Sequence, residues 1–171
     1  MKKRSKQVTY VSIVFVVTLV TTAIAATVIY DNLTYWSHGP VHWHADFTIV
    51  ACGTQVTLPS SHSLLTTEVG NSHLHHHGDM RVHVEGAIRS PSDVTLQAFF
   101  RAIGGDLEQD TITYPTETGT ATWKDGDRCP DGHAGRLTVF INDKESSSFV
   151  NYIISPYFDV PPGDQIRFEF N

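Results

Sequence analysis

The longest apolar run in the chain lies near its N-terminus. From about Val8 to Tyr30 the sequence carries no charged residue, which is long enough for a helix to cross a bilayer. The run is preceded by four cations, Lys2, Lys3, Arg4 and Lys6, and such a bias leaves the N-terminus in the cytoplasm. We therefore predict a basic cytoplasmic tail (1–7), a transmembrane anchor (8–30) and an extracytoplasmic remainder.

A cleaved signal peptide is the alternative to this anchor. Ala23-Ile24-Ala25 is a small-residue pattern that a signal peptidase accepts, although the apolar run is longer than an ordinary signal core. We prefer a single-pass membrane protein, and a cleaved, secreted form stays open.

After a polar stalk (31–41) the polarity alternates residue by residue, as in half-buried strands. HWHADFTIV has one apolar face, formed by Trp43, Ala45, Phe47 and Ile49. The turn-like ACG joins it to TQVTLP, which predicts a β-hairpin. A second strand pair is predicted over 72–86, where Val82 and Val84 share a face and Gly78-Asp79 marks a turn.

The clearest helix pattern is RSPSDVTLQAFFRAIGG. Its apolar residues follow the spacing i, i+3, i+4, i+7: Leu96, Phe99, Phe100 and Ile103. Ser92 or Asp93 can cap the start, and Gly104-Gly105 ends the helix. A polar insertion loop follows over 104–135, with TITY and TATW as candidate short strands, and the strands LTVFIND and QIRFEF come last.

This order of elements resembles the β-grasp fold of ubiquitin-like and sulfur-carrier proteins. LTVFINDKE…FVNYIISPYFDVPPGDQIRFEF carries most of the likeness. The resemblance implies an α+β domain over 42–171, a β-grasp-like mixed sheet packed on one helix, with a His-rich β-hairpin insertion. It does not imply carrier activity, because the chain ends in Phe168-Glu169-Phe170-Asn171 and not in a Gly-Gly tail.

The chain is also similar to an uncharacterised family of membrane-anchored or secreted prokaryotic His-rich proteins. The shared motifs are His42-Trp43-His44, His73-Leu74-His75…Val82-His83-Val84, the TLQAFF helix and the LTVFIN strand. The likeness covers about residues 41–171. The triple His75-His76-His77 and the 104–135 insertion depart from the family pattern, and the resemblance implies no particular activity.

Nine of the ten histidines lie between positions 38 and 83. Residues i and i+2 of a strand share a face, and the strand histidines have the parity opposite to the apolar residues. We therefore expect their imidazoles on the side away from the core. If the second hairpin pairs beside the first strand, five of them converge: His42, His44, His73, His75 and His83.

Clustered neutral imidazoles favour borderline transition metals, Cu(II), Zn(II) or Ni(II), over calcium and magnesium, which prefer oxygen ligands. Asp46, Asp79 or Glu85 are optional carboxylate ligands. His76 has the opposite parity, and His77 lies at the turn and fits either face. The predicted cofactor is a transition metal, copper or zinc, held by the five converging histidines.

The preferred function is a membrane-tethered metal-binding domain for storage, delivery or sensing. One alternative is a non-catalytic accessory subunit of a membrane assembly, with a protein partner and histidines that pack or respond to pH. The other is a metal-dependent enzyme in which Asp46 or Glu85 moves protons, although no known catalytic motif is present.

Charge and cysteine content further restrict the partners and the redox role that the protein can have. The chain has 12 Lys and Arg against 18 Asp and Glu, and four of the cations precede the apolar run. The exported part is therefore acidic, which excludes nucleic acid as a partner. The two cysteines, Cys52 and Cys129, do not form a C-x-x-C motif and are either one structural disulfide or two separate thiols.

Overall fold

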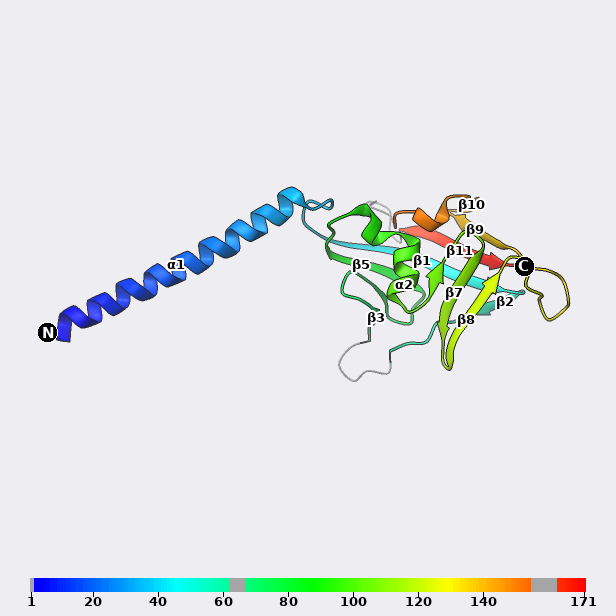
Figure 1. The fold of residues 1–171 in the computed structure, drawn as a ribbon, viewed down its shortest axis with the longest axis horizontal. Helices are drawn as coiled ribbons and strands as arrows, with labels where there is room; N and C mark the ends of the chain where they lie inside the picture. Colours follow the sequence, from blue (N-terminus) through cyan, green and yellow to red (C-terminus); the bar gives the residue numbers. More distant parts are fainter. Residues whose placement is uncertain (1, 62–66, 155–162) are drawn as a thin grey trace.

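The computed structural model describes residues 2–61, 67–154 and 163–171. His62, for which the sequence predicts a loop, lies outside the described residues. A long helix projects from one end of a mixed α+β domain (Figure 1).

The projecting helix, α1 (Lys2–Thr34), contains the apolar run. Its segment Lys6–Thr34 is long and apolar enough to cross a membrane, and no residue of its most apolar stretch is buried. Its length and composition are those of a membrane-spanning segment. The helix is longer than the predicted anchor because the chain stays helical through the first part of the predicted stalk.

The predicted stalk (31–41) overlaps the elements on either side of it. Its first residues are helical, and its last two belong to the first strand. Between them, the N–H groups of Trp36 and Ser37 donate to the carbonyls of Arg89 and Ile88 at 3.2 and 3.1 Å. These hydrogen bonds hold the residues that follow α1 against the domain.

The main sheet has eight strands. They are β1 (Pro40–Ala51), β2 (Thr54–Val56), β3 (Val69–Gly70), β4 (Leu74–His76), β5 (Arg81–Ala87), β9 (Leu137–Ile141), β10 (Lys144–Glu145) and β11 (Asp164–Phe170). Their order is β10-β9-β11-β1-β5-β4-β3, and β2 also pairs with β1. β1 and β11 are parallel in the middle of the sheet, and the other pairs are antiparallel.

Both predicted hairpins are present. β1 and β2 join at Cys52 and Gly53, whose φ angles of 50° and 74° are the two positive values that a type I′ turn requires. β4 and β5 form the second antiparallel pair, and β5 also pairs with β1. The arrangement that the histidine hypothesis required is therefore present.

The predicted helix is divided in two. A 3-10 helix, η1 (Pro91–Val94), is capped by Ser90, and α2 (Leu96–Ala102) is capped by Thr95, whose side chain accepts a hydrogen bond from the Ala98 N–H. Ser92 and Asp93 therefore do not cap α2, because they lie inside the preceding turn. Gly104, with φ +91°, follows the end of α2 as predicted.

The core lies between α2 and one face of the main sheet (Figure 1). Leu96, Phe99 and Phe100 of α2 are buried, and aromatic rings from both layers contact edge to face. Phe99 meets Phe47 of β1 at 5.3 Å, and Phe100 meets Phe168 of β11 at 5.1 Å, measured between ring centroids. Such rings bury much of the apolar area that stabilises a domain. A second short 3-10 helix, η2 (Phe149–Asn151), precedes the last strand.

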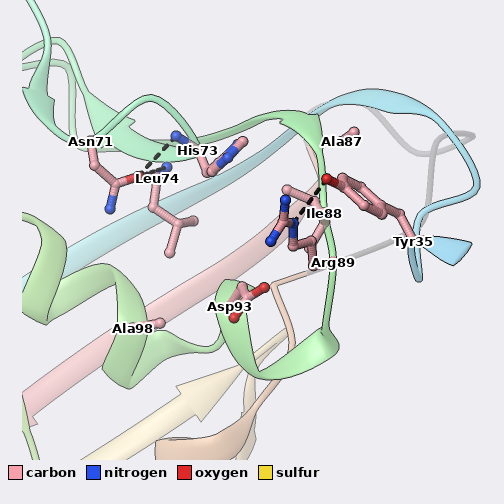
Figure 2. Close-up of a pocket in the computed structure, with 9 residues that line it drawn as sticks. All are labelled: Tyr35, Asn71, His73, Leu74, Ala87, Ile88, Arg89, Asp93 and Ala98. Carbon is pink, nitrogen blue, oxygen red and sulfur yellow. Dashed lines mark hydrogen bonds between the residues drawn. The ribbon is translucent and has the colours of Figure 1, made fainter. Parts of the chain in front are cut away.

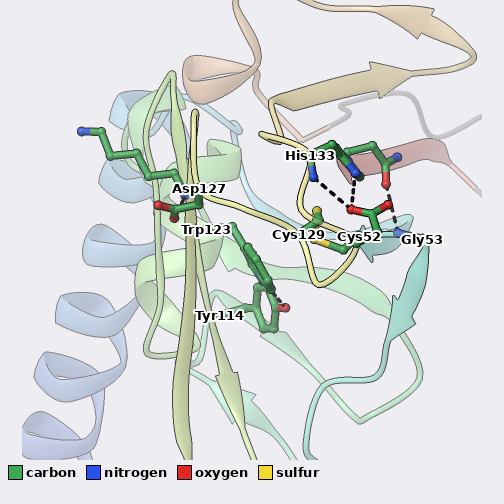
Figure 3. Close-up of a disulfide and its surroundings, with 10 residues drawn as sticks. Cys52, Gly53, Tyr114, Trp123, Asp127, Cys129 and His133 are labelled. Carbon is green, nitrogen blue, oxygen red and sulfur yellow. Dashed lines mark hydrogen bonds and ion pairs between the residues drawn. A yellow bond between two sulfur atoms is a disulfide. The ribbon is translucent and has the colours of Figure 1, made fainter.

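The 104–135 segment contains both candidate short strands, TITY and TATW, so it is not a loop throughout. It forms a second sheet of three strands, β6 (Asp106–Leu107), β7 (Thr111–Thr116) and β8 (Gly119–Lys124). Ile112 and Tyr114 of β7 are buried, and the Trp123 ring packs 5.2 Å from that of Phe170. The Trp123 Nε1–H donates to the Tyr114 hydroxyl at 3.1 Å (Figure 3). This sheet covers the core instead of standing out in solvent.

The two cysteines form a disulfide. Cys52, in the β1–β2 turn, is bonded to Cys129, in the loop after β8 (Figure 3). Of the two alternatives left open by the sequence, the structural disulfide is therefore the one present. It ties the inserted segment to the main sheet.

Candidate metal centre

Three histidines stand side by side on adjacent strands. In the backbone register, His44 of β1 lies opposite His83 of β5, and His83 lies opposite His75 of β4. Residues paired in this way point to the same face of a sheet with Cβ atoms about 4.5 to 5.5 Å apart. The strand pairing therefore brings three imidazoles from distant parts of the sequence into one row.

Two more histidines extend the row into two groups that fit a metal ion. The outer group is His42, His44 and His83, and the inner group is His75, His77 and His83. Within each group one nitrogen of every ring lies within 4.8 Å of the others. Three imidazoles at this separation close around Zn(II) or Cu(II) after small side-chain rotations, since metal–nitrogen bonds are about 2.0 to 2.1 Å long. His83 belongs to both groups.

The outer group faces solvent. The side chain of His42 is 61% exposed, and its Nε2 lies 2.9 Å from the Nε2 of His44. The Oε1 atom of Glu85 lies 3.3 Å from the same His42 nitrogen. Two ring nitrogens and a carboxylate oxygen thus converge at the surface.

The inner group is less exposed: His75 is buried, and His77 and His83 are half-buried. His75 lies opposite His83 and shares its face, as its parity indicates, yet it is only 1% exposed. Its Nδ1 lies 3.2 Å from the carbonyl oxygen of Asn71, which can only accept, so Nδ1 carries the proton. Its Nε2 is buried and has no hydrogen-bond partner among the described residues. A lone pair is therefore directed into the group.

His83 is arranged in the same way. Its Nε2 lies 3.4 Å from an oxygen of Asp79, and its Nδ1 is buried without a hydrogen-bond partner in the described part of the chain. Hydrogen bonds from the His77 N–H and the His83 ring lower the pKa of Asp79 despite the opposing effect of burial, so this carboxylate accepts. The proton of His83 accordingly lies on Nε2, and the lone pair is on Nδ1.

The structure adds His77 to the site. Its Nδ1 lies 3.0 Å from the Thr67 hydroxyl, and its ring lies 5.0 Å from that of His75. A hydrogen bond on one ring nitrogen is the usual way in which proteins orient a histidine that binds a metal through the other. Thr67 and Asn71, the residues that orient His77 and His75, have no signal in the sequence because their contacts are set by tertiary structure.

His73 is placed away from both groups. Its Nδ1 lies 2.8 Å from the carbonyl oxygen of Glu85, and its side chain lines a separate pocket of about 540 Å³ with Tyr35 and Arg89 (Figure 2). Arg89 Nε donates to the Tyr35 hydroxyl at 2.9 Å on the far side of this pocket. Of the five predicted ligands, the structure therefore brings together His42, His44, His75 and His83.

His76 lies on the core side, as its parity indicated. It is 0% exposed, its ring lies 6.4 Å from that of Phe99, and its Nδ1 accepts a hydrogen bond from the Gly78 N–H at 2.9 Å. Burial lowers the pKa of His76, although Asp79 opposes the shift. His76 is therefore a neutral core residue.

Two rings of the site, those of His44 and His83, have lowered pKa values. Burial lowers the pKa of His44, and the neighbouring rings of His83 and His42 lower it further. Burial likewise lowers the pKa of His83, against the opposing effect of Asp79. Because a metal binds the deprotonated ring, both shifts favour metal over protons near neutral pH.

Asp46 forms an ion pair with Arg81. Arg81 holds its carboxylate with hydrogen bonds of 2.6 and 3.1 Å, and this pairing lowers the pKa of Asp46. A carboxylate stabilised in its charged form is a poor proton acceptor, so Asp46 does not suit the role that the enzymatic hypothesis gave it. Glu85 is the carboxylate closest to the ring nitrogens, since it lies between the outer and inner groups.

Comparison with known proteins gives no relative: no protein-family model, curated protein or solved structure matches the chain.

Proposed function

We propose that this protein is a membrane-tethered extracytoplasmic domain that binds a transition-metal ion, copper or zinc, through clustered histidines. The observation that carries the proposal is the buried Nε2 of His75, which has no hydrogen-bond partner among the described residues. Leaving a buried polar atom without a partner costs about 1 to 3 kcal/mol, and a bound metal ion removes that cost. The adjacent nitrogens of His77 and His83 complete a three-imidazole set.

The kind of metal follows from the ligands. Three neutral imidazoles suit Zn(II) and Cu(II), and a fourth position remains for water or for a donor or acceptor molecule. Storage, delivery or sensing each require such a reversible site. No protein partner is needed for this chemistry, although a membrane assembly that supplies or receives the ion is compatible with it.

Two features support a location outside the cytoplasm. The helix α1 is long and apolar enough to span a bilayer, and its four preceding cations favour a cytoplasmic N-terminus. The Cys52–Cys129 disulfide belongs to an oxidising compartment, since cytosolic thiols are kept reduced. The uncharacterised family of anchored or secreted His-rich proteins remains the proposed relationship.

We also infer a β-grasp-like architecture. Around the parallel pair β1–β11 the strand order β2-β1-β11-β9-β10, with α2 between the first and second hairpins, is the order expected of that fold. In this interpretation, β4 and β5 are an inserted hairpin that pairs with the exposed edge of β1 and carries three of the ligands.

The test is metal binding by the full-length chain, purified in detergent without a His tag. The protein is stripped with a chelator, exposed to Cu(II) or Zn(II), desalted and examined by elemental analysis. We expect close to one tightly held ion per chain, and less than about 0.2 would refute the proposal. His133→Ala is the matched control, because His133 is an exposed histidine outside both groups.

A further inference from the structure

The two histidine groups differ in exposure but share one ligand. His42 of the outer group is exposed and His75 of the inner group is buried, while His83 belongs to both. Two separate metal sites do not need a common residue. Because His83 is shared, the two groups either bind two ions at once or bind a single ion one after the other.

The tautomer of His83 answers this question. Its Nε2–H is directed at Asp79, so Nδ1 supplies the single available lone pair. One lone pair forms one metal–nitrogen bond at a time. In this tautomer His83 can bind a metal through Nδ1 alone, so an ion in the outer group and an ion in the inner group compete for His83.

We propose that the two groups are successive positions of a single ion. This proposal rests on the proposed function. The outer group receives the ion from solvent or from a donor, and the inner group retains it. His83 stays bound throughout, while His42 and His44 are exchanged for His75 and His77.

Glu85 lies on the path between the two positions. Its Oε1 atom is 3.3 Å from Nε2 of His42 and 4.0 Å from Nε2 of His75. A carboxylate at this place attracts a cation in the outer position and in the inner position. It also lowers the energy of the ion during the transfer, when neither pair of histidines is fully bound to it.

The environment of the inner position favours retention. The Nδ1–H of His75 is held by the Asn71 carbonyl, and His77 is held through Thr67. Rings fixed in this way lose little freedom when they bind an ion. Among the described residues, the ring nitrogens of His42 and His44 contact each other and Glu85, and no backbone carbonyl or hydroxyl orients either ring.

The proposal is tested by comparing loading rate with affinity. Full-length protein in detergent is mixed with Zn(II) or Cu(II) in a stopped-flow instrument, and affinity is measured by competition with a chelator. The outer variant is His42→Ala/His44→Ala, the inner variant is His75→Ala/His77→Ala, and the control is His38→Ala/His133→Ala. His77→Ala alone serves if the inner double variant fails to fold.

We expect one ion per chain in the unmodified protein. The outer variant should keep its affinity within about 3-fold but load at least about 10-fold more slowly, and the inner variant should load normally but bind at least about 100-fold more weakly. Two ions per chain, or unchanged loading in the outer variant, would overturn the proposal while leaving metal binding intact. Failure of the unmodified protein to bind any metal would instead refute the proposed function.

Discussion

The imidazole rings of His75 and His83 lie parallel, with centroids 5.3 Å apart and an angle of 4° between the ring planes. The backbone holds this stack, because the two residues are directly opposite in the β4–β5 register. A pair of rings fixed by strand pairing is preorganised, so little entropy is lost when both bind one ion.

Substitution of His75 should therefore weaken metal binding strongly. Loss of an orienting partner of a ligand typically costs 10- to 100-fold in affinity, so loss of the ligand itself in His75→Ala should exceed about 100-fold. Competition with a chelator measures the effect, and metal-free thermal unfolding monitors folding. His133→Ala should bind as the unmodified protein does. Equal affinities of the two variants would rule out the inner group as the site.

Substitution of His73 should leave metal binding nearly unchanged. His73→Ala removes the hydrogen bond to the Glu85 carbonyl, which is worth about 0.5 to 1.5 kcal/mol of folding stability. The same chelator competition should give an affinity within about 3-fold of the original. A loss comparable to that of His75→Ala would show that His73 reaches the ion and that its position differs when metal is bound.

The metal-free domain should lose stability as the pH falls. The folded-state pKa values of His44, His76 and His83 are lowered from the ordinary histidine value of about 6.5, so the unfolded chain binds more protons in the interval below that value. Stability is therefore complete above about pH 6.5 and decreases below it. Denaturant midpoints across this interval provide the measurement.

The variant His76→Leu distinguishes the contribution of the core histidine to the pH dependence of stability from that of the histidines in the two groups. His76 has the most buried of these rings, so its replacement should flatten the dependence of the midpoint on pH, whatever its effect on stability at neutral pH. A midpoint that is constant or rises toward low pH in the unmodified protein would contradict the expectation.

Removal of the disulfide should destabilise the domain without altering the metal site. Cys52 and Cys129 are 77 residues apart, and a cross-link of this span typically contributes about 2 to 5 kcal/mol. Cys52→Ala/Cys129→Ala should lose that amount in denaturant unfolding. Its metal affinity should be retained, because Cys52 lies roughly 25 Å from His44 along an extended strand. Loss of metal affinity in a variant that remains folded would show that the disulfide and the metal site are coupled.

The predicted orientation in the membrane is tested by labelling cysteines in intact cells. Ser147→Cys lies on the exposed surface of the domain, and Ser5→Cys precedes the apolar segment. A membrane-impermeant maleimide should label the first and not the second, since the native cysteines are bonded to each other. The reverse pattern would place the domain in the cytoplasm.

Much of the fold follows from local patterns. The alternation around Trp43 and Phe47, the helix spacing around Phe99 and the paired positive φ angles at Cys52 and Gly53 each depend on residues close in sequence. The helix start was misplaced because Ser90 and Thr95 each cap a separate turn. Capping residues are common in such a stretch, and packing selects between them.

Buried strands in the 104–135 segment were harder to predict. Its Thr, Gly and Asp content is typical of loops, yet Ile112 and Tyr114 alternate toward the core. Two apolar positions in a short strand are a weak signal, and their burial depends on contacts with the end of β11, far away in sequence.

For the site, the sequence by itself determined the residue type and the strand parity. The imidazoles occupy alternate positions on the face opposite to the apolar residues. Tertiary structure alone decided that β5 lies between β1 and β4, which places His83 between His44 and His75. Tertiary structure also determines that His75 is buried, that His77 belongs to the inner group and that His73 lines a different pocket. The reason is physical: side-chain direction depends on local backbone geometry, whereas the distances between ligands and their burial depend on which distant strands share hydrogen bonds.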